Sequence, residues 1–337
     1  MKKPFLILCC VLFLFLAACS APREEKTVGT APFSSPFLSQ ETKETVEEEP
    51  VLTPVIEAPD SMQIRVQYKD PSIEFPKAEA VDEKGNSYPV DLEGEYDLTS
   101  PGEYTLYFVT KNSLGERIQK EFTLTVLASP FNEKGEMIDG VYVTDKGFEL
   151  VVKDGIAYVD GYLVANKTFP LPKEYAPNGL VKEASDAYWT MRGAAPAEVR
   201  GRLMIVSGYR SWLDQYVIFR NYCNRDGIVE AETYSARPGH SEHQSGYAMD
   251  LVCSSTVASS QPQNVDALKW LDDNAWKFGF IKRYPENKTN ETGYKFEPWH
   301  YRYVGTELAE ILYNNGDWIT MEDYFGFDSV YQAPYQP

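Results

Sequence analysis

Only three histidines occur among the 337 residues of this chain, and all of them fall in two short segments. His240 and His243 lie in the stretch A-R-P-G-H-S-E-H-Q-S-G-Y-A-M-D, and His300 ends the stretch F-E-P-W-H. Imidazole is the commonest side-chain ligand of transition metals, and both segments also contain carboxylates. We therefore expect a fold that brings two segments distant in sequence to one metal site.

Length and charge limit the classes of function. The chain is longer than the roughly 100 to 200 residues of a typical domain, which predicts at least two domains. Fifty Asp and Glu residues against 32 Lys and Arg residues give a net charge of −18. Nucleic acid phosphates need a basic patch to displace their counterions, so the acidic excess argues against nucleic acid as a partner.

The N-terminus has the pattern of a secretory signal. Two lysines follow Met1, and the apolar run Pro4–Ala18 is shorter than the roughly 20 residues of a membrane-spanning helix. Leu16-Ala17-Ala18-Cys19 resembles the lipobox of bacterial lipoproteins. The resemblance implies that residues 1–18 are a signal peptide and that lipidated Cys19 anchors an extracytoplasmic protein to the cell membrane. An uncleaved membrane anchor is the alternative.

Two of the five cysteines would leave with the signal peptide and Cys19 would carry lipid. Cys223 and Cys253 then remain in the folded part. They could form a disulfide in an oxidising compartment, or they could be two buried free thiols. Their spacing gives no geometric test, so both interpretations stay open.

The first half of the chain changes character twice. Residues 19–59 are rich in Pro, Ser, Thr and Glu and predict a disordered acidic tether. Residues 60–127 alternate polar and apolar side chains in short runs separated by turns, which predicts a small β-sandwich. The run Pro101-Gly102-Glu103-Tyr104-Thr105-Leu106 resembles bacterial immunoglobulin-like domains. The partner of such a domain stays open.

The second half mixes helices and strands. Residues 128–159 predict a linker and a β-hairpin, residues 160–325 an α+β domain, and residues 326–337 a C-terminal tail. Apolar periodicity predicts helices that end at Asp226-Gly227, Gly279 and Gly316. Strands are expected between them over residues 202–206, 247–252 and 301–304.

The spacing of the polar residues suggests chemistry. His243 and Asp250 flank Gly246, so a loop histidine and a strand aspartate can converge. Pro298 biases Glu297 towards an extended conformation, which places Glu297 and His300 at a junction between a loop and a strand. Two histidines and one carboxylate leave a fourth tetrahedral position open, as in catalytic zinc sites, and a second carboxylate can serve as the base.

Four elements together resemble one known family. S-E-H-Q-S-G-Y-A-M-D matches the pattern S-x-H-x-x-G-x-A-x-D of the zinc D-Ala-D-Ala carboxypeptidases, which include the VanY-type D,D-carboxypeptidases and related L,D-carboxypeptidases. E-P-W-H matches its second half, Ser207-Gly208-Tyr209-Arg210-Ser211 matches a third element, and Leu163-Val164-Ala165-Asn166-Lys167 resembles the usual start of the domain. The resemblance implies an α+β catalytic domain of the Hedgehog/DD-peptidase type over residues 160–325.

The resemblance also implies a role for each matching position. His243, Asp250 and His300 are expected to bind one zinc ion, and Glu297 is expected to be the catalytic base. Arg210 is expected to act in catalysis and substrate binding, and Ser241 to bind substrate. His240 lies outside the signature, and we expect it to be an outer partner of the site, a substrate contact or an exposed residue rather than a ligand.

The function implied is removal of the C-terminal D-alanine from peptidoglycan stem peptides outside the cell membrane. The D,D or L,D preference stays open, as does the identity of the metal, since the same ligands could hold other divalent ions. Two alternatives remain: an L-alanyl-D-glutamate peptidoglycan endopeptidase on the same site, and a wall-binding lipoprotein without catalytic activity.

Overall fold

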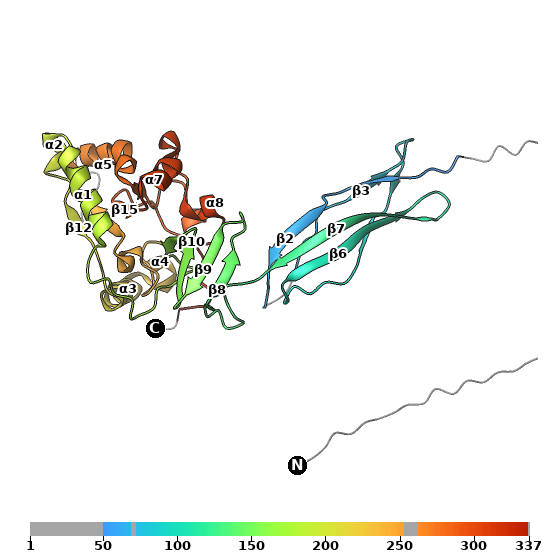
Figure 1. Cartoon of the computed structure of the whole chain (residues 1–337), viewed down its shortest axis with the longest axis horizontal. Coiled ribbons are helices and arrows are strands. Elements are labelled where there is room, and N and C mark those ends of the chain that lie inside the picture. Colours follow the sequence, from blue (N-terminus) through green and yellow to red (C-terminus); the bar gives the residue numbers. More distant parts are fainter. Residues whose placement is uncertain (1–49, 69–71, 253–261, 336–337) are drawn as a thin grey trace, which may run out of the picture. The chain divides into compact units, whose positions relative to one another are not determined.

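A computed structural model describes residues 50–68, 72–252 and 262–335 of the chain (Figure 1). The predicted signal peptide, Cys19, the tether up to residue 49 and Cys253 lie outside the described residues. The lipid anchor and the disulfide of Cys223 therefore stay predictions. Within the described ranges, every helix is too short or too polar to cross a lipid bilayer.

Within residues 51–68 and 72–127, the chain forms two small β-sheets around a shared apolar cluster. One sheet has the order β1-β3-β4 and the other β2-β7-β6-β5. The long hairpin of β6 and β7 alternates in burial, so that Leu106, Phe108, Phe122 and Leu124 face the core. The strands are β1 (Val55–Glu57), β2 (Ser61–Arg65), β3 (Glu79–Val81), β4 (Ser87–Tyr88), β5 (Asp91–Glu93), β6 (Gly102–Lys111) and β7 (Arg117–Leu127).

Strand β1 corrects one predicted boundary. It lies inside the range 19–59 that the sequence predicted as tether, and it pairs antiparallel with β3, with Val55 opposite Val81. A three-residue strand held by a distant partner leaves no periodic signal of its own, which is why composition alone missed it. The immunoglobulin-like character of this β-domain stays a prediction.

A four-stranded antiparallel sheet with the order β11-β10-β9-β8 follows (Figure 1). It contains the predicted hairpin, and β11 adds a strand through the pair Ala157 and Val164. The predicted boundary between residues 159 and 160 therefore runs through one sheet. Its buried face packs against helices α7 and α8 in one apolar cluster. The bounds are β8 (Gly140–Val143), β9 (Glu149–Lys153), β10 (Ile156–Val159), β11 (Tyr162–Val164), α7 (Thr306–Tyr313) and α8 (Met321–Phe325).

The central sheet of the C-terminal part is antiparallel, with the order β12-β13-β15-β14. Helices α1 (Lys182–Ala194) and α5 (Pro262–Asn274) pack on it through an apolar cluster that includes Met191, Met249, Leu271 and Tyr301. The mixture of helices with antiparallel strands confirms the α+β class. The strands are β12 (Ile205–Ser207), β13 (Ala248–Leu251), β14 (Phe280–Lys282) and β15 (His300–Tyr303).

Short helices connect these elements and place the loops of the site. The predicted helices are confirmed, and Gly279 ends one of them with φ 84°, where an added Cβ would lie 2.8 Å from the ring of Tyr303. Strand β13 stops at Leu251 because Val252 has a φ of 69°. The remaining helices are α2 (Ala197–Arg200), α3 (Trp212–Asp226), α4 (Ile228–Ala231), η1 (Glu242–Ser245), η2 (Ala275–Phe278), α6 (Thr289–Thr292) and η3 (Asn314–Gly316).

Candidate metal centre

The signature segment folds as a tight helical turn followed by a strand. Helix η1 carries His243 and ends at Gly246, which has φ 77° and ψ 1°. An added Cβ at Gly246 would lie 2.7 Å from the carbonyl oxygen of Gly179, so both the backbone conformation and the space require glycine. Strand β13 follows directly, and all four of its side chains are buried. The turn thereby carries the chain from His243 to Asp250 within one compact unit.

The second segment reaches the same place through sheet pairing. His300 is the first residue of β15, and β15 pairs antiparallel with β13 so that Asp250 lies directly opposite His300. Residues directly opposite each other in an antiparallel pair have neighbouring side chains. Register therefore brings Asp250 and His300 together, and the η1 turn adds His243.

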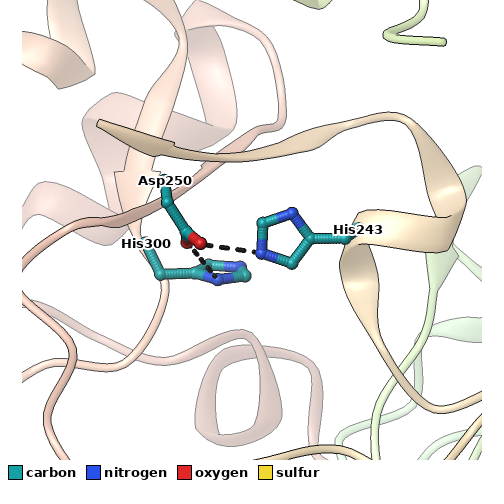
Figure 2. A group of neighbouring side chains, drawn as sticks. All are labelled: His243, Asp250 and His300. Carbon is teal, nitrogen blue, oxygen red and sulfur yellow. Dashed lines mark ion pairs between the residues drawn. The ribbon is translucent and has the colours of Figure 1, made fainter. Parts of the chain in front are cut away.

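The three side chains converge on one point (Figure 2). Nε2 of His243 lies 3.3 Å and Nδ1 of His300 lies 3.4 Å from Oδ1 of Asp250. The three ligand atoms lie within 4.8 Å of one another, and all three residues are buried. Nε2 of His243 and Oδ1 of Asp250 make no hydrogen bond despite their burial. Buried polar atoms without partners are rare, and a cation bound between these atoms would satisfy them.

Each imidazole is oriented by a partner on its far side. Nδ1 of His243 lies 2.7 Å from the carbonyl oxygen of Gly208, which can only accept, so Nδ1 donates and Nε2 keeps its lone pair. Nε2 of His300 lies 3.2 Å from Oε2 of Glu242, which leaves Nδ1 facing Asp250. Such outer partners fix the tautomer of metal-binding histidines. In the neutral form of each ring, the nitrogens with free lone pairs are the two that converge on Asp250.

Neighbouring charges shift the pKa values of the site in different directions. Burial lowers the pKa of His243 to about 4, and the charge of Arg210 adds to this effect. Burial also acts to lower the pKa of His300, but the carboxylates of Asp250 and Glu242, which face its two ring nitrogens, outweigh burial and raise the pKa to about 9. Burial opposes ionisation of Asp250, yet the two histidines hold its pKa well below the usual range. Both histidines contact Asp250, but their pKa values differ because His300 also faces the carboxylate of Glu242.

Glu297 lies beside the converging atoms without being one of them. Its Oε2 is 3.6 Å from Nδ1 of His300, and its side chain is 15% exposed. The pKa of Glu297 is raised to about 7, mainly by burial; the charge of His300 opposes this shift and the charge of Asp250 contributes to it. A carboxyl group with a pKa near neutrality can both accept and return a proton at the pH of most cells.

The site opens into a cavity of about 380 Å³. Arg210 lines it and donates from Nη1 to Oε1 of Gln215 at 3.0 Å, while its buried Nε has no partner. Ser211 starts helix α3 with a capping box, which fixes the backbone next to Arg210. Ser241 is 5% exposed and also lines the cavity. All six residues expected in the site therefore line one cavity: Arg210, Ser241, His243, Asp250, Glu297 and His300.

His240 lies apart from the converging atoms and is partly buried. Its Nδ1 is 2.8 Å from the carbonyl oxygen of Asn166, and its ring packs edge-on against Tyr331. Arg237, in the same loop, pairs with Glu232 at 2.6 Å. Neither His240 nor Arg237 lines the cavity of the candidate site.

Sequence reasoning missed the buried charges behind His300. Glu242, Arg283 and Glu322 are at most 3% exposed, and they form a chain of ion pairs that reaches His300. One signal was available for Arg283, which directly follows the strand β14 and its two apolar residues, Phe280 and Ile281. Nothing in the sequence marks Glu322, which meets Arg283 only through the fold.

Comparison with known proteins places the site in a family context. Residues 177–306, which include all six expected site residues, match the family VanY, D-alanyl-D-alanine carboxypeptidase. The chain is 41% identical to YodJ of Bacillus subtilis (strain 168), provisionally named a carboxypeptidase, over 48% of this chain and 66% of that protein. It is 31% identical to the bifunctional D-Ala-D-Ala dipeptidase and D-Ala-D-Ala carboxypeptidase VanXYC of Enterococcus gallinarum, over 48% of this chain and 92% of that protein.

Among solved structures, the chain resembles an L,D-carboxypeptidase, DacB, from Streptococcus pneumoniae. The TM-score is 0.47 and the identity 35%, covering 55% of this chain and 100% of that one. The chain spans about two thirds of the length of YodJ and about half or less of two enterococcal relatives.

Proposed function

The chain belongs to the VanY family of D-alanyl-D-alanine carboxypeptidases, and on that premise we propose that it is a zinc-dependent carboxypeptidase acting on peptidoglycan stem peptides. It removes the C-terminal D-alanine. The observation that carries the proposal is one cavity in which His243, Asp250 and His300 converge while Glu297 lies beside them.

The ligand set favours zinc. Two imidazole nitrogens and one carboxylate oxygen match the three protein ligands of catalytic zinc sites, and the cavity leaves room for a fourth position. His243, Asp250 and His300 would hold one ion. A zinc ion bound there would acidify a water molecule and polarise the carbonyl group of the scissile peptide bond.

The residues around the three ligands supply the remaining chemistry. Glu297 lines the cavity with its Oε2 3.6 Å from Nδ1 of His300, where it can take a proton from the attacking water and pass it to the amine nitrogen of the leaving D-alanine. Arg210 presents its unpaired Nε–H to the cavity, where a guanidinium can stabilise the developing oxyanion or bind the terminal carboxylate of the substrate. The buried hydroxyl of Ser241 offers a further hydrogen bond to the substrate backbone.

We place this reaction outside the cell membrane. Support comes from the sequence, in which the apolar run Pro4–Ala18 ends in Leu16-Ala17-Ala18-Cys19. Lipid on Cys19 would anchor the protein, and the residues before the β-domain would let the enzyme reach the cell wall. Metabolic labelling with a radioactive fatty acid should mark the wild-type protein and leave Cys19→Ala unlabelled.

The experiment that tests the proposal is digestion of defined stem peptides with three, four and five residues, followed by mass spectrometry. Loss of D-alanine from the pentapeptide demonstrates D,D activity, and loss from the tetrapeptide demonstrates L,D activity. Cleavage between L-alanine and D-glutamate would instead identify an endopeptidase. No cleavage by the zinc-loaded protein would contradict catalysis and leave a wall-binding role.

A further inference from the structure

A buried carboxylate stands behind the metal-facing histidine of strand β15. Glu242 is 2% exposed, and its Oε2 lies 3.2 Å from Nε2 of His300. Its other oxygen, Oε1, accepts a hydrogen bond from Nε of Arg283 at 2.8 Å. Arg302 adds a second positive charge 3.7 Å from the same oxygen. Glu242 therefore faces a histidine on one side and only cationic donors on the other.

Arg283 is held on both sides of its guanidinium. Its Nη1 and Nη2 donate to the two oxygens of Glu322 at 2.7 and 2.5 Å, while its Nε donates to Glu242. Glu322 lies in helix α8 and also accepts from Nδ2 of Asn166 at 3.1 Å. A guanidinium presents its donors in a rigid planar fork, so it fixes the position and rotamer of both carboxylates.

Stability alone is a poor reason to keep such a group. Removing two charges from water costs free energy, and a buried ion pair often stabilises a protein no more than apolar residues of the same size. The contact between Glu242 and His300 has a further consequence. An ionised carboxylate can only accept a hydrogen bond, so Nε2 of His300 must carry a proton, and in the neutral ring that a metal would bind Nδ1 then keeps the lone pair.

We propose that Glu242 is a positioning residue that selects the metal-binding tautomer of His300, with Arg283 as the clamp that holds it in place. The inference deepens the proposed function and rests on it, because it concerns the affinity of the same site for its metal. Glu322 shares the clamp without touching His300, so it contributes to folding and leaves the tautomer unchanged.

The amide variant Glu242→Gln tests the inference because its two ends are chemically different. Arg283 and Arg302 offer only donors, so the amide oxygen must face them. The amide NH2 group then faces Nε2–H of His300, so two hydrogen-bond donors point at each other. The ring relieves this conflict by moving its proton to Nδ1, the nitrogen that would bind the metal. The substitution keeps the size of the side chain and reverses the hydrogen bond.

The matched control is Glu322→Gln, which places the same amide on the other side of Arg283. It also puts an NH2 among donors, since both oxygens of Glu322 accept from Arg283. Its cost in stability should resemble that of Glu242→Gln, while Glu242 still faces His300. The two variants therefore separate loss of folding from loss of the tautomer.

The measurement is the zinc affinity of the purified protein in competition with a chromogenic chelator, alongside its unfolding by denaturant. We expect Glu242→Gln to bind zinc about 10- to 100-fold more weakly than wild type, the usual cost of losing an outer partner of a ligand. Glu322→Gln should bind zinc as wild type does. The visible spectrum of the cobalt-substituted protein should change in Glu242→Gln and stay constant in Glu322→Gln.

Two results would overturn the inference. One is wild-type zinc affinity and cobalt spectrum in Glu242→Gln, and the other is an equal loss of zinc affinity in both variants, which would make the buried charges purely structural. If wild-type protein binds neither zinc nor cobalt, the proposed metal-dependent function fails with it. The two failures are thus distinguished by the wild-type titration.

A second measurement applies even if Glu242→Gln does not fold. The chain has only three histidines, so nitrogen NMR of ¹⁵N-histidine-labelled wild-type protein loaded with zinc gives few ring signals. The inference requires that His300 carries its proton on Nε2 and that this proton is shielded from exchange by Glu242. A metal-bound Nε2 on His300 would contradict it.

Discussion

Two histidines three residues apart in sequence, His240 and His243, show how little proximity in sequence says about role. His243 is buried and His240 is partly buried, and desolvation lowers the pKa of each to about 4. The free nitrogen of His243 converges with Asp250 and His300 and has no hydrogen-bond partner. His240 instead packs against Tyr331 and hydrogen-bonds the Asn166 backbone.

The surroundings of His243 and His240 differ in how many buried polar atoms lack a hydrogen-bond partner. Five buried side-chain atoms in the described residues lack a partner, and three of them belong to Arg210, His243 and Asp250, which line one cavity. Around His240, by contrast, Arg237 pairs with Glu232, donates to the carbonyl of Ala333 and packs on Tyr331. Unsatisfied polar atoms that converge therefore mark the candidate site better than histidine content or burial does.

The largest expected effect is on the rate of hydrolysis, and it distinguishes the catalytic base from the three metal ligands. Glu297→Gln should lower the rate of stem-peptide hydrolysis by about 10²- to 10⁴-fold, because the general base and acid are lost together. Zinc affinity should remain, since Glu297 is not one of the three converging ligands. The assay is D-alanine release, with the exposed residue Glu286 changed to Gln as the control. Loss of zinc from Glu297→Gln would show that the roles are assigned wrongly.

The next largest effect is on kcat, and it distinguishes Arg210 from Arg237. Arg210→Lys should lower kcat by about 10²- to 10³-fold, the usual cost of removing one donor to a developing oxyanion, because lysine cannot reproduce the planar guanidinium. Arg237→Lys should leave kcat unchanged, since Arg237 does not line the cavity. Steady-state kinetics on the preferred stem peptide measures both. Equal losses in the two variants would refute the distinction drawn between the two arginines.

The third prediction concerns metal removal. Zinc at 100 times its dissociation constant should stabilise the wild-type protein by about 2.7 kcal/mol, because it binds the folded state alone. Asp250→Ala should lose this zinc-dependent stabilisation, and His240→Asn should keep it. Thermal unfolding with zinc and with a chelator provides the measurement. A zinc-independent unfolding temperature in the wild-type protein would argue against a metal at His243, Asp250 and His300.

Much of the fold was predictable because the signals are local. Helix periodicity and glycine stops located α3, the helix that ends at Gly279 and α7. Helix α1 and strand β1 were missed, since α1 is held by its packing on the central sheet and β1 by pairing with β3. Such elements depend on distant partners, so a local pattern cannot reveal them.

In the candidate site, too, residues with a local sequence signal could be predicted, and residues that depend on distant partners could not. The ligands and Glu297 could be predicted because they lie at fixed spacing within two short segments. Glu242 lay inside the first segment and was overlooked, because its importance comes from Arg283 and Glu322, which only the fold brings to it. A motif thus identifies atoms that touch the reaction more readily than the buried charges that orient them.

The smallest expected effect concerns His240 and the pH dependence of stability. Burial lowers its pKa to about 4 in the folded state, with a smaller contribution from the charge of Arg237, against roughly 6.5 in the unfolded state. Between these values the unfolded state binds more protons, so acid favours unfolding as the pH falls from about 6.5 towards 4. At pH 5 the resulting loss of folding free energy should be about 2 kcal/mol.

His240→Asn should remove this contribution, because its amide can still donate to the Asn166 carbonyl but does not titrate. The test is denaturant unfolding of both proteins at pH 7 and pH 5 in the presence of a chelator. Subtracting the pH-dependent change in the free energy of unfolding of one protein from that of the other cancels the contributions of the histidines and carboxylates that both contain. The free energy of unfolding of the variant should fall less on acidification than that of the wild-type protein. At neutral pH the variant should hydrolyse stem peptides at the wild-type rate. An identical loss in both proteins would mean that His240 is not held neutral, and the contrast with His243 would then rest on geometry alone.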